Sequence, residues 1–353
     1  MSKKSNKKIP YQTSKINKGK RNLKPREPEP NFFEVLILAT MSSGKSTLLN
    51  AMLGLDLMPT SNQACTAKIF RIEDFDQLTD FQVETLSNSP WNPESKWQKV
   101  DRAHLNELNQ SSAQQQIKIR GNILGIDNHH SHLVIYDTPG PNNSSNPLHA
   151  ETTDKLLRDG CYGAVLYVMN AKQFGIDDDK ALLDNLKKIS KNENKHFKKI
   201  IFVLNKTDAL DEEKGETLVS AVQDAIEYLQ EIGFLNPTVI PVSAFHAGLA
   251  RKALLGQELA SRDKSRLVSV VKRLDQPRVF RNLANAKLPQ DFTHLQAILA
   301  KALRLEKRDN EQQIGDFFES DLEAVLAQSG LLVLEKLLDD LVKKQAKQGK
   351  PQQ

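Results

Sequence analysis

Short apolar runs alternate with amphipathic stretches along most of the chain, and this alternation predicts the fold. Apolar runs bounded by polar turns are typical of buried strands, and we expect strands at residues 34–39, 69–73, 116–126, 133–136, 164–169, 199–204 and 238–242. Helical periodicity is found at residues 46–53, 151–158, 177–190 and 216–232. The alternation indicates an α/β domain with a mainly parallel sheet and helices on both faces.

Two segments depart from this simple alternation. Residues 116–126 and 133–136 are joined by a polar turn at 127–131, so we expect them to pair as an antiparallel hairpin at one edge of the sheet. Residues 74–115 are polar, with helical character around 103–109. We interpret them as an insertion that its tryptophans anchor to the domain.

Helices are expected to complete the C-terminal part. Residues from about 247 to 308 have a helical, charged pattern, and a closing helix is expected at about 322–342. Its apolar face consists of Leu331, Leu334, Leu338, Leu341 and Val342. We expect this face to pack on the sheet, with a partner helix from another chain as the alternative. The whole domain is then expected to span residues 31–345, with a polar tail at 346–353.

Charge divides the chain unevenly. The net charge is +5, yet residues 1–26 hold ten Lys or Arg and no acidic residue, which leaves 39 basic against 44 acidic residues in the remainder. With several prolines and few large apolar residues, residues 1–30 are expected to be a disordered basic tail. Such a tail can contact an anionic membrane or nucleic acid, or it can be a solvated tail without a dedicated partner.

Composition also bears on the compartment. No apolar run is long enough to span a membrane, and the charged N-terminus lacks the apolar segment of a secretory signal. Cys65 and Cys161 have no metal-ligand spacing, so we expect free thiols in a reducing compartment. The expected location is the cytoplasm.

The first candidate site follows the apolar run at residues 35–39. The sequence there is Ala39-Thr40-Met41-Ser42-Ser43-Gly44-Lys45-Ser46-Thr47, and a helical pattern comes directly after it. A strand, a loop and a helix in this order are the setting of a phosphate-binding loop, whose backbone N–H groups surround a phosphate at the helix start. The predicted phosphate-binding residues are Ser42, Ser43, Gly44, Lys45, Ser46 and Thr47. Lys45 is expected to neutralise the β- and γ-phosphates, and the Ser46 hydroxyl to ligate Mg²⁺.

Three further motifs each follow an expected strand. Asp137-Thr138-Pro139-Gly140 offers a carboxylate that can hold a Mg²⁺-bound water, and a glycine N–H that can reach the γ-phosphate. In Asn205-Lys206-Thr207-Asp208, the Asp208 carboxylate can accept two hydrogen bonds from guanine, which adenine cannot offer. Asn205 can bridge the base and the phosphate loop, and the Lys206 stem can cover the base. Ser243-Ala244 places a backbone N–H near guanine O6. Ligands of open α/β sheets bind at such strand ends, so GTP is the predicted substrate.

With these motifs in order, the chain resembles a GTPase of the translation-factor-related class and, within it, the bacterial dynamin-like proteins. Ser42 matches the serine of the dynamin phosphate loop, and residues 57–66 resemble the first switch of that family. The Asp137-Thr138-Pro139-Gly140-Pro141-Asn142 run and the long insertion before it are also similar to that family.

The resemblance implies a P-loop GTPase domain that binds GTP with Mg²⁺ and hydrolyses it to GDP and phosphate. It implies charge compensation by Ser42 and a second Mg²⁺ ligand at Thr66, whose carbonyl orients the attacking water. Release of the Thr66 and Gly140 segments after γ-phosphate loss makes the domain a switch. The implied partner is a second copy, bound through the G domain, or a separate dynamin-like chain.

Some positions depart from the family. Met41 stands where a polar residue is common, and Pro141 stands where Ras-type enzymes have glutamine, so hydrolysis is expected to be slow in the isolated domain and faster in a dimer. The segment after Ala244 is too short for a long stalk, so membrane scission by this chain alone is not expected. Two alternatives stay open: a GTPase that grips ribosomal RNA with its basic tail, and a GTP-dependent scaffold without hydrolysis.

Overall fold

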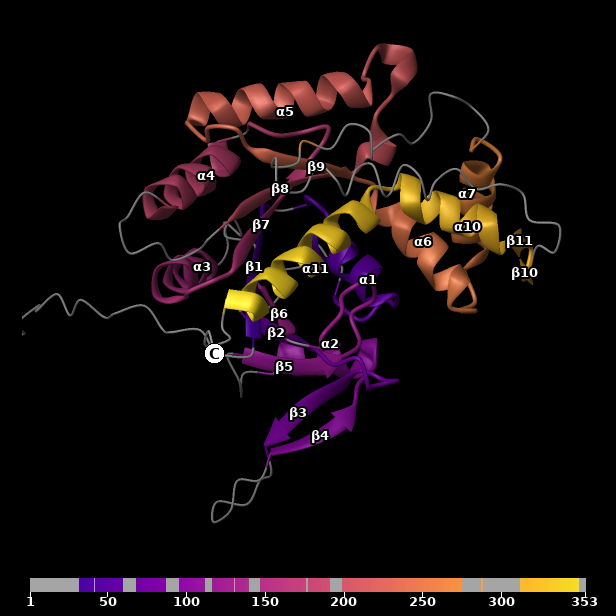
Figure 1. Ribbon diagram of the computed structural model, residues 1–353, viewed down its shortest axis with the longest axis horizontal. Coiled ribbons are helices and arrows are strands. Elements are labelled where there is room, and N and C mark those ends of the chain that lie inside the picture. Colours follow the sequence, from indigo (N-terminus) through magenta and orange to yellow (C-terminus); the bar gives the residue numbers. More distant parts are fainter. Residues whose placement is uncertain are drawn as a thin grey trace, which may run out of the picture.

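A mixed β-sheet runs through the protein, with helices packed against both of its faces (Figure 1). The computed structural model describes residues 32–40, 42–59, 68–86, 95–111, 116–129, 131–139, 147–175, 177–190, 199–274, 287 and 312–348. Over these residues the large sheet has nine strands in the order β4-β3-β5-β2-β6-β1-β7-β8-β9.

Seven of the nine strands lie close to the expected positions, and the other two lie within the segment that was interpreted as an insertion. They are β1 (Phe32–Ala39), β2 (Ile69–Asp74), β3 (Gln82–Leu86), β4 (Ser95–Lys99), β5 (Gln116–Gly121), β6 (His132–Asp137), β7 (Ala164–Asn170), β8 (Ile200–Asn205) and β9 (Thr238–Val242). The run β6-β1-β7-β8-β9 is parallel throughout. The carboxyl ends of these strands therefore meet at one edge, where open α/β sheets bind ligands.

Helices cover the sheet in two groups. They are α1 (Lys45–Leu53), α2 (Arg102–Gln110), α3 (Pro147–Asp159), α4 (Asp177–Ser190), α5 (Leu218–Ile232), α6 (Ala244–Leu254), α7 (Ser261–Val271), α10 (Glu319–Gln328) and α11 (Leu331–Gln348). Helices α3, α4 and α5 lie on one face of the sheet, and α1, α6, α10 and α11 on the other (Figure 1). The predicted α/β class with helices on both faces is confirmed.

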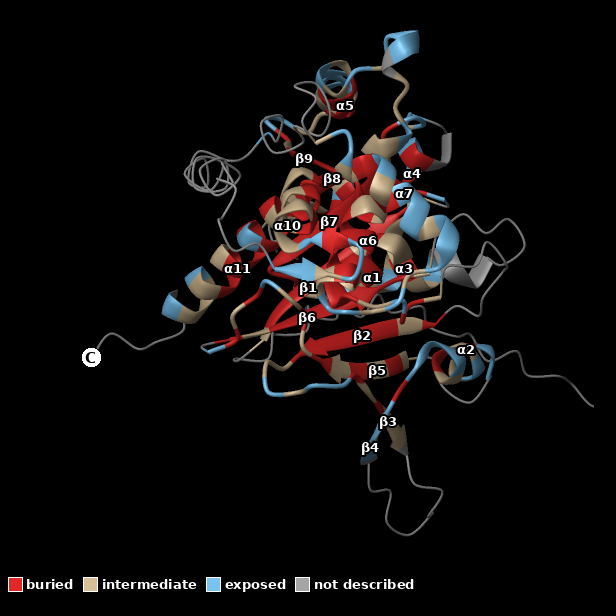
Figure 2. Cartoon of the chain, turned by 90° about the vertical axis from the view of Figure 1, so that its right-hand side faces the viewer, coloured by how far each residue is buried: buried red, intermediate tan, exposed pale blue. Residues whose placement is uncertain are grey.

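Strand β1 shows why both faces are covered. Val35 and Ile37 belong to the core shared with α1, α6 and α11, whereas Leu36 and Leu38 belong to the core shared with α3, α4 and α5. Successive side chains of a strand point to opposite faces, so an uninterrupted apolar run has to be buried on both sides. Figure 2 shows the central strands as buried along most of their length.

The expected hairpin of residues 116–126 with 133–136 is wrong. Strand β2 lies between β5 and β6; it pairs parallel with β5 and antiparallel with β6. Strand β5 already ends at Gly121, and the chain then passes the end of β2, where the Asp74 carboxylate accepts a hydrogen bond from the Ile123 N–H at 2.6 Å. The connection therefore crosses over β2 instead of turning tightly into its neighbour.

An antiparallel edge hairpin is present, but other residues form it. Strands β3 and β4 pair antiparallel at the edge of the sheet, inside the segment that the sequence indicated as an insertion. The guanidinium carbon of Arg120 on β5 lies 4.2 Å from the centre of the Trp97 ring on β4, a cation–π contact that anchors the hairpin. Trp91 lies outside the described residues. The helix expected around 103–109 is α2, capped by the Asp101 side chain.

The single closing helix expected at 322–342 is two helices, α10 and α11. Gly330 between them has a φ of +83°, a left-handed conformation that ends α10 and favours glycine. The Ser329 hydroxyl then accepts a hydrogen bond from the Leu331 N–H at 3.2 Å, at the start of α11. The expected apolar face is buried against the sheet core, including Leu334 and Leu338. The small two-stranded sheet of β10 (Gln313–Ile314) and β11 (Phe317–Phe318) precedes α10.

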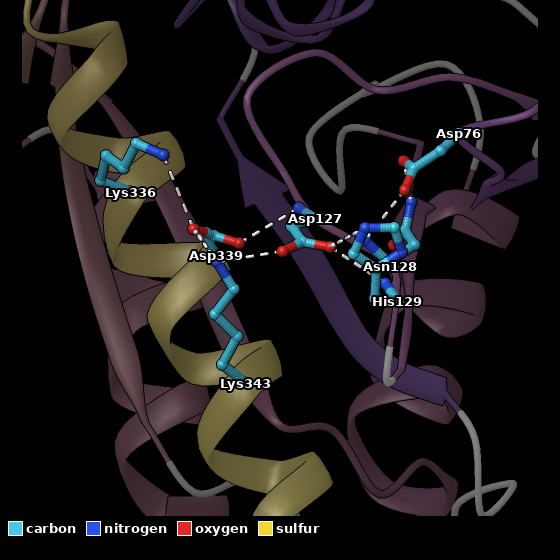
Figure 3. Close-up of polar contacts among 7 residues, drawn as sticks. All are labelled: Asp76, Asp127, Asn128, His129, Lys336, Asp339 and Lys343. Atoms are coloured by element: carbon cyan, nitrogen blue, oxygen red, sulfur yellow. Dashed lines mark hydrogen bonds and ion pairs between the residues drawn. The ribbon is translucent and has the colours of Figure 1, made fainter.

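Polar contacts hold α11 against the loop between β5 and β6 (Figure 3). The Asp127 N–H donates to Asp339 Oδ1 at 3.1 Å, and Lys343 Nζ lies 3.0 Å from Asp339 Oδ2 and 3.4 Å from Asp127 Oδ2. On the other side of the loop, Asn128 donates from its backbone and side-chain nitrogens to the Asp76 carboxylate. The C-terminal helix is thus fixed to the end of β2 through this loop.

Candidate nucleotide-binding site

The loop between β1 and α1 has the conformation that a phosphate site needs. Ser42 and Gly44 have φ values of +63° and +86°, and these left-handed residues turn the chain sharply into the helix. Among the described residues, no side chain caps the N-terminus of α1 and no acidic residue lies in its first turn. The first N–H groups of α1, including those of Ser46 and Thr47, have no acceptor within the helix. They form the positive end of the helix dipole.

Lys45 and Asp137 meet beneath this loop. Asp137 ends β6, which pairs in parallel with β1 so that Ile37 faces Asp137 across the ladder. The Lys45 ammonium forms an ion pair with Asp137 Oδ1, and the two side chains are only 14% and 6% exposed. Burial raises the pKa of the Asp137 carboxyl, and the charge and hydrogen bond of Lys45 oppose that rise. The structure thus brings these two predicted residues together.

Asn205 connects three parts of the site. Its side-chain amide lies at the end of β8 and is buried. Nδ2 donates to the Ser43 carbonyl at 3.0 Å and lies 3.4 Å from the Gly44 carbonyl, while Oδ1 accepts from the Ala244 N–H at 3.1 Å. One amide therefore joins the phosphate loop to the start of α6, which fixes their separation.

Asp208 and Ser243 form the opposite end of the site. The Ser243 hydroxyl donates to Asp208 Oδ1 at 2.7 Å and accepts from the His246 N–H at 3.3 Å as the N-cap of α6. The Ser243 N–H donates to the Ser329 carbonyl at 2.8 Å. The break between α10 and α11 thus supports the segment that carries Ser243. Lys206, with a φ of +64°, turns the chain from β8 toward Asp208.

A pocket of about 520 Å³ lies between these groups. One set of its lining residues belongs to the predicted motifs: Gly44, Thr47, Asn205, Lys206 and Asp208. A second set comes from α6, α7 and the turn after α7: Phe245, His246, Arg266, Ser269, Val270 and Arg273. The second set was missed by the sequence reasoning. The spacing 266, 269, 270 and 273 is one helical face, which was the available signal.

His246, in the second set of lining residues, has a pKa that its surroundings shift. Burial lowers the pKa of its imidazole, the Asp208 carboxylate opposes this, and the charges of Arg273 and Arg266 lower the pKa further. The imidazole therefore favours its neutral form. The charges of Arg273 and Arg266 thus act on the imidazole from the α7 side of the pocket.

Two predicted site residues lie outside the described residues: Thr66 and Gly140. The same holds for Met41, Pro141 and the basic segment 1–30. Within the part of the chain that is described, we find no helix whose length and apolar character would let it cross a membrane.

The part of the chain that carries these motifs is similar to a known protein family. The model of the dynamin family matches residues 35–207, which run from β1 to the Asn205-Lys206-Thr207-Asp208 motif and make up just under half of the chain. Together with the P-loop fold, this match identifies a dynamin-family GTPase domain within the chain, as the sequence motifs predicted.

A curated relative and several solved structures are also similar. The uncharacterized protein in xynA 3′region of Caldicellulosiruptor sp. (strain Rt8B.4) is 27% identical over 216 residues, which cover 61% of this chain and 50% of the relative. This chain thus spans about half the length of that relative.

Among the structures, a chain of an oligomerised bacterial dynamin pair, described as sensing and tethering membranes over long range, aligns with a TM-score of 0.46 and 17% identity over 76% of this chain and 43% of that chain. Aquifex aeolicus Era bound to GDP·AlF4⁻ aligns with a TM-score of 0.35 and 18% identity over 79% of this chain and 69% of that chain. Similarity at this level carries no conclusion about activity.

Proposed function

We propose that this chain binds GTP with Mg²⁺, hydrolyses it to GDP and phosphate, and acts as a nucleotide-dependent switch through contact between G domains. The observation that carries the proposal is the Asn205 amide, which holds the phosphate loop and the Ser243-Ala244 segment at a fixed separation. A ligand that fills this site needs phosphates at one end and a base at the other.

Guanine fits the base end. One oxygen of the Asp208 carboxylate accepts from the Ser243 hydroxyl, which orients the group toward the pocket that Lys206 and Phe245 also line. A carboxylate held in this way can accept hydrogen bonds from guanine N1–H and N2–H₂. Adenine presents an acceptor at N1 and would face the carboxylate with like polarity. We therefore infer selectivity for guanine.

The phosphate end fits a triphosphate with Mg²⁺. Hydroxyl and carboxylate oxygens are the donors that Mg²⁺ prefers, and Ser46 and Asp137 offer them at the ends of neighbouring elements. Ser46, with Thr66, would ligate the ion, and Asp137 would hold one of its waters. When bound, the ion would supply positive charge to the phosphate oxygens. Lys45, within reach of the same region, would turn from Asp137 to the β- and γ-phosphates.

Hydrolysis is proposed to proceed by in-line attack of water on the γ-phosphorus, with cleavage of the bond to the β–γ bridging oxygen and no covalent intermediate. Ser42 is exposed at the mouth of the loop, where its side chain can contact a second G domain. We assign it charge compensation at that contact. The Thr66 carbonyl would orient the water, and the Gly140 N–H would contact the γ-phosphate.

We also propose the extent of the domain and a role for the basic segment. Residues 31–345 are proposed to be the GTPase domain, and residues 1–26 to contact an anionic membrane or nucleic acid in the cytoplasm. The positive charge of that segment supports the second proposal.

Phosphate release at increasing protein concentration tests the function. We expect the rate per chain with GTP and Mg²⁺ to rise with concentration, because Ser42 acts across the contact between two chains. The Ser42→Ala variant should lose this rise while it retains GTP affinity. A rate at background over the whole range would contradict hydrolysis and favour a GTP-dependent scaffold. RNA that copurifies with the chain, and is lost when residues 1–26 are deleted, would favour a ribosome-associated role instead.

A further inference from the structure

Helix α7 forms a wall of the candidate nucleotide pocket that none of the motifs covers. Arg266, Ser269 and Val270 line the pocket from successive turns of this helix, and Arg273 continues the same face in the turn that follows it. Positions i, i+3, i+4 and i+7 of a helix share one face, so both arginine side chains start from the side that faces the pocket.

The pocket has more positive charge than its motifs require. Its lining holds three cations, Lys206, Arg266 and Arg273, against the single carboxylate of Asp208. A guanine base and a ribose are uncharged, and the phosphate loop already offers Lys45 and the N-terminus of α1 to a phosphate chain. Two guanidinium groups on the α7 wall are thus left over after the base and the 5′ phosphates have been assigned.

Arg266 and Arg273 differ in the contacts that their side chains make. The Arg266 guanidinium carbon lies 5.0 Å from the centre of the Phe245 ring, which is in the lining of the same pocket. Asp263 Oδ1 lies 3.7 Å from its Nη1, a distance too long for a strong hydrogen bond. Arg273 is exposed, and no carboxylate of the described residues forms an ion pair with it. The guanidinium group of Arg266 is therefore partly oriented before a ligand binds, and that of Arg273 keeps its N–H donors for a ligand.

Guanidinium groups on a shared wall are suited to one kind of ligand. The planar fork of arginine matches the oxygens of a phosphate, and charge-assisted hydrogen bonds of this type are stronger than neutral ones. Asp208 supplies the single carboxylate of the pocket lining, and the buried, neutral imidazole of His246 carries no charge that could offset the two guanidinium groups. A second phosphate group is the chemistry that satisfies both arginines.

We propose that Arg266 and Arg273 form a second phosphate-binding pair in the guanine-nucleotide site, on the α7 side of the pocket. The inference rests on the proposed function, since it takes the ligand to be a guanine nucleotide. The phosphate can come from two sources: the 5′ chain of GDP or GTP itself, where it leaves the phosphate loop, or a phosphate group esterified to the ribose at the 3′ position.

Binding of two nucleotides distinguishes the sources. Guanosine 5′-diphosphate and guanosine 3′-diphosphate 5′-diphosphate are titrated into the full chain and into the Arg266→Ala and Arg273→Ala variants. Arg262→Ala is the matched control, because Arg262 lies on the same helix, is exposed and is absent from the pocket lining. Thermal unfolding of each variant verifies that it is folded.

We expect each pocket variant to weaken binding by about tenfold, the value of a charge-assisted hydrogen bond at a partly exposed site. If only the 3′-phosphorylated nucleotide loses affinity, the pair binds a ribose phosphate; if both lose it equally, the pair binds the 5′ chain. Unchanged affinity for both nucleotides would overturn the inference and leave the proposed function standing. An equal loss of affinity in Arg262→Ala would also overturn it, since the loss would then come from the positive charge of the whole helix and not from the pocket arginines. No binding of either nucleotide by the unaltered chain would instead contradict the proposed function.

Discussion

At the residue scale, Lys45 and Asp137 form an ion pair at the phosphate loop. Both side chains are largely buried, so each needs the other or an equivalent charge. A triphosphate offers Lys45 a second anion, and a hydrated cation offers Asp137 a second partner. We therefore propose that the pair is exchanged for ligand contacts when a nucleotide binds.

Replacement of Lys45 by alanine tests this arrangement. We expect GTP affinity to fall by more than about 100-fold, because a buried ammonium that forms charge-assisted hydrogen bonds with phosphate is lost. The measurement is a titration with a fluorescent GTP analogue. Lys252→Ala is the control, since Lys252 forms its ion pair with Asp56 away from the pocket and its loss should leave affinity unchanged. Tight binding by Lys45→Ala would argue against the phosphate-loop assignment.

Asp74 is a second buried residue, and its charge affects the free energy of unfolding. Its side chain is buried at the end of β2, Oδ2 has no hydrogen-bond partner among the described residues, and burial raises the pKa of the carboxyl from 3.8 to about 7. The folded protein then keeps a proton that the unfolded chain releases between these two values. The free energy of unfolding should therefore fall as the pH rises from about 4 to about 7, by up to about 4 kcal/mol.

The Asp74→Asn variant should remove this slope. Asparagine keeps an oxygen for the Ile123 N–H but does not titrate, so its free energy of unfolding should change less over the same pH range. Urea unfolding at several pH values measures the difference. Asp80→Asn, at an exposed carboxylate paired with Lys99, serves as the control and should keep the slope of the unaltered chain. A slope that survives in Asp74→Asn would show that other groups cause it.

At the scale of elements, a buried ion pair joins three helices. Arg251 of α6 donates through Nη2 to Glu335 Oε2 of α11 at 2.8 Å, and through Nη1 to the Ala51 carbonyl of α1 at 2.8 Å. Burial raises the pKa of the Glu335 carboxyl, while the hydrogen bonds and charge of Arg251 lower it. The helix that starts at the phosphate loop is thus connected to the C-terminal helix by one guanidinium.

Removal of one partner should destabilise the fold strongly. Glu335→Leu leaves the Arg251 charge buried and should lower the free energy of unfolding by about 3–5 kcal/mol. The joint change Arg251→Met and Glu335→Leu should recover a large part of that loss, because it removes both charges. Chemical denaturation of the single and double variants measures the coupling. If the double variant were as unstable as the sum of the single ones, the pair would not act as a unit.

Elements were predictable from the sequence where the signal is local. The strand at Thr238–Val242 and the helix at Asp177–Ser190 lie where the pattern predicted them, since alternation and helical periodicity are local properties. The break at Gly330 was missed because apolar spacing continues through it, although a left-handed glycine ends the helix. Strands β3 and β4 were missed because an edge hairpin is polar on its exposed side.

At the scale of the whole molecule, the order of the strands in the sheet could not be predicted from the sequence. Strand β2 lies between β5 and β6, and no pattern within the three strands records that order. The motifs at residues 44–45, 137, 205–208 and 243–244 were nevertheless recognised, because each follows a strand whose end lies at the same edge of the sheet. The arginines of α7 were not, since they reach the pocket only through the packing of α6 and α7.

We propose above all that this one site selects guanine through Asp208 and hydrolyses the nucleotide that it selects. Steady-state phosphate release with GTP and with xanthosine triphosphate, by the unaltered chain and by Asp208→Asn, tests it most directly. Xanthine carries a carbonyl where guanine has its amino group, so an amide can donate to it where a carboxylate cannot.

We expect the unaltered chain to prefer GTP, and Asp208→Asn to reverse the preference in kcat/KM by about 100-fold or more, because the variant replaces a hydrogen-bond acceptor with a donor. Asp211→Asn, a nearby acidic residue that is absent from the pocket lining, should keep the preference for GTP. A preference for GTP that is unchanged in Asp208→Asn would contradict the account.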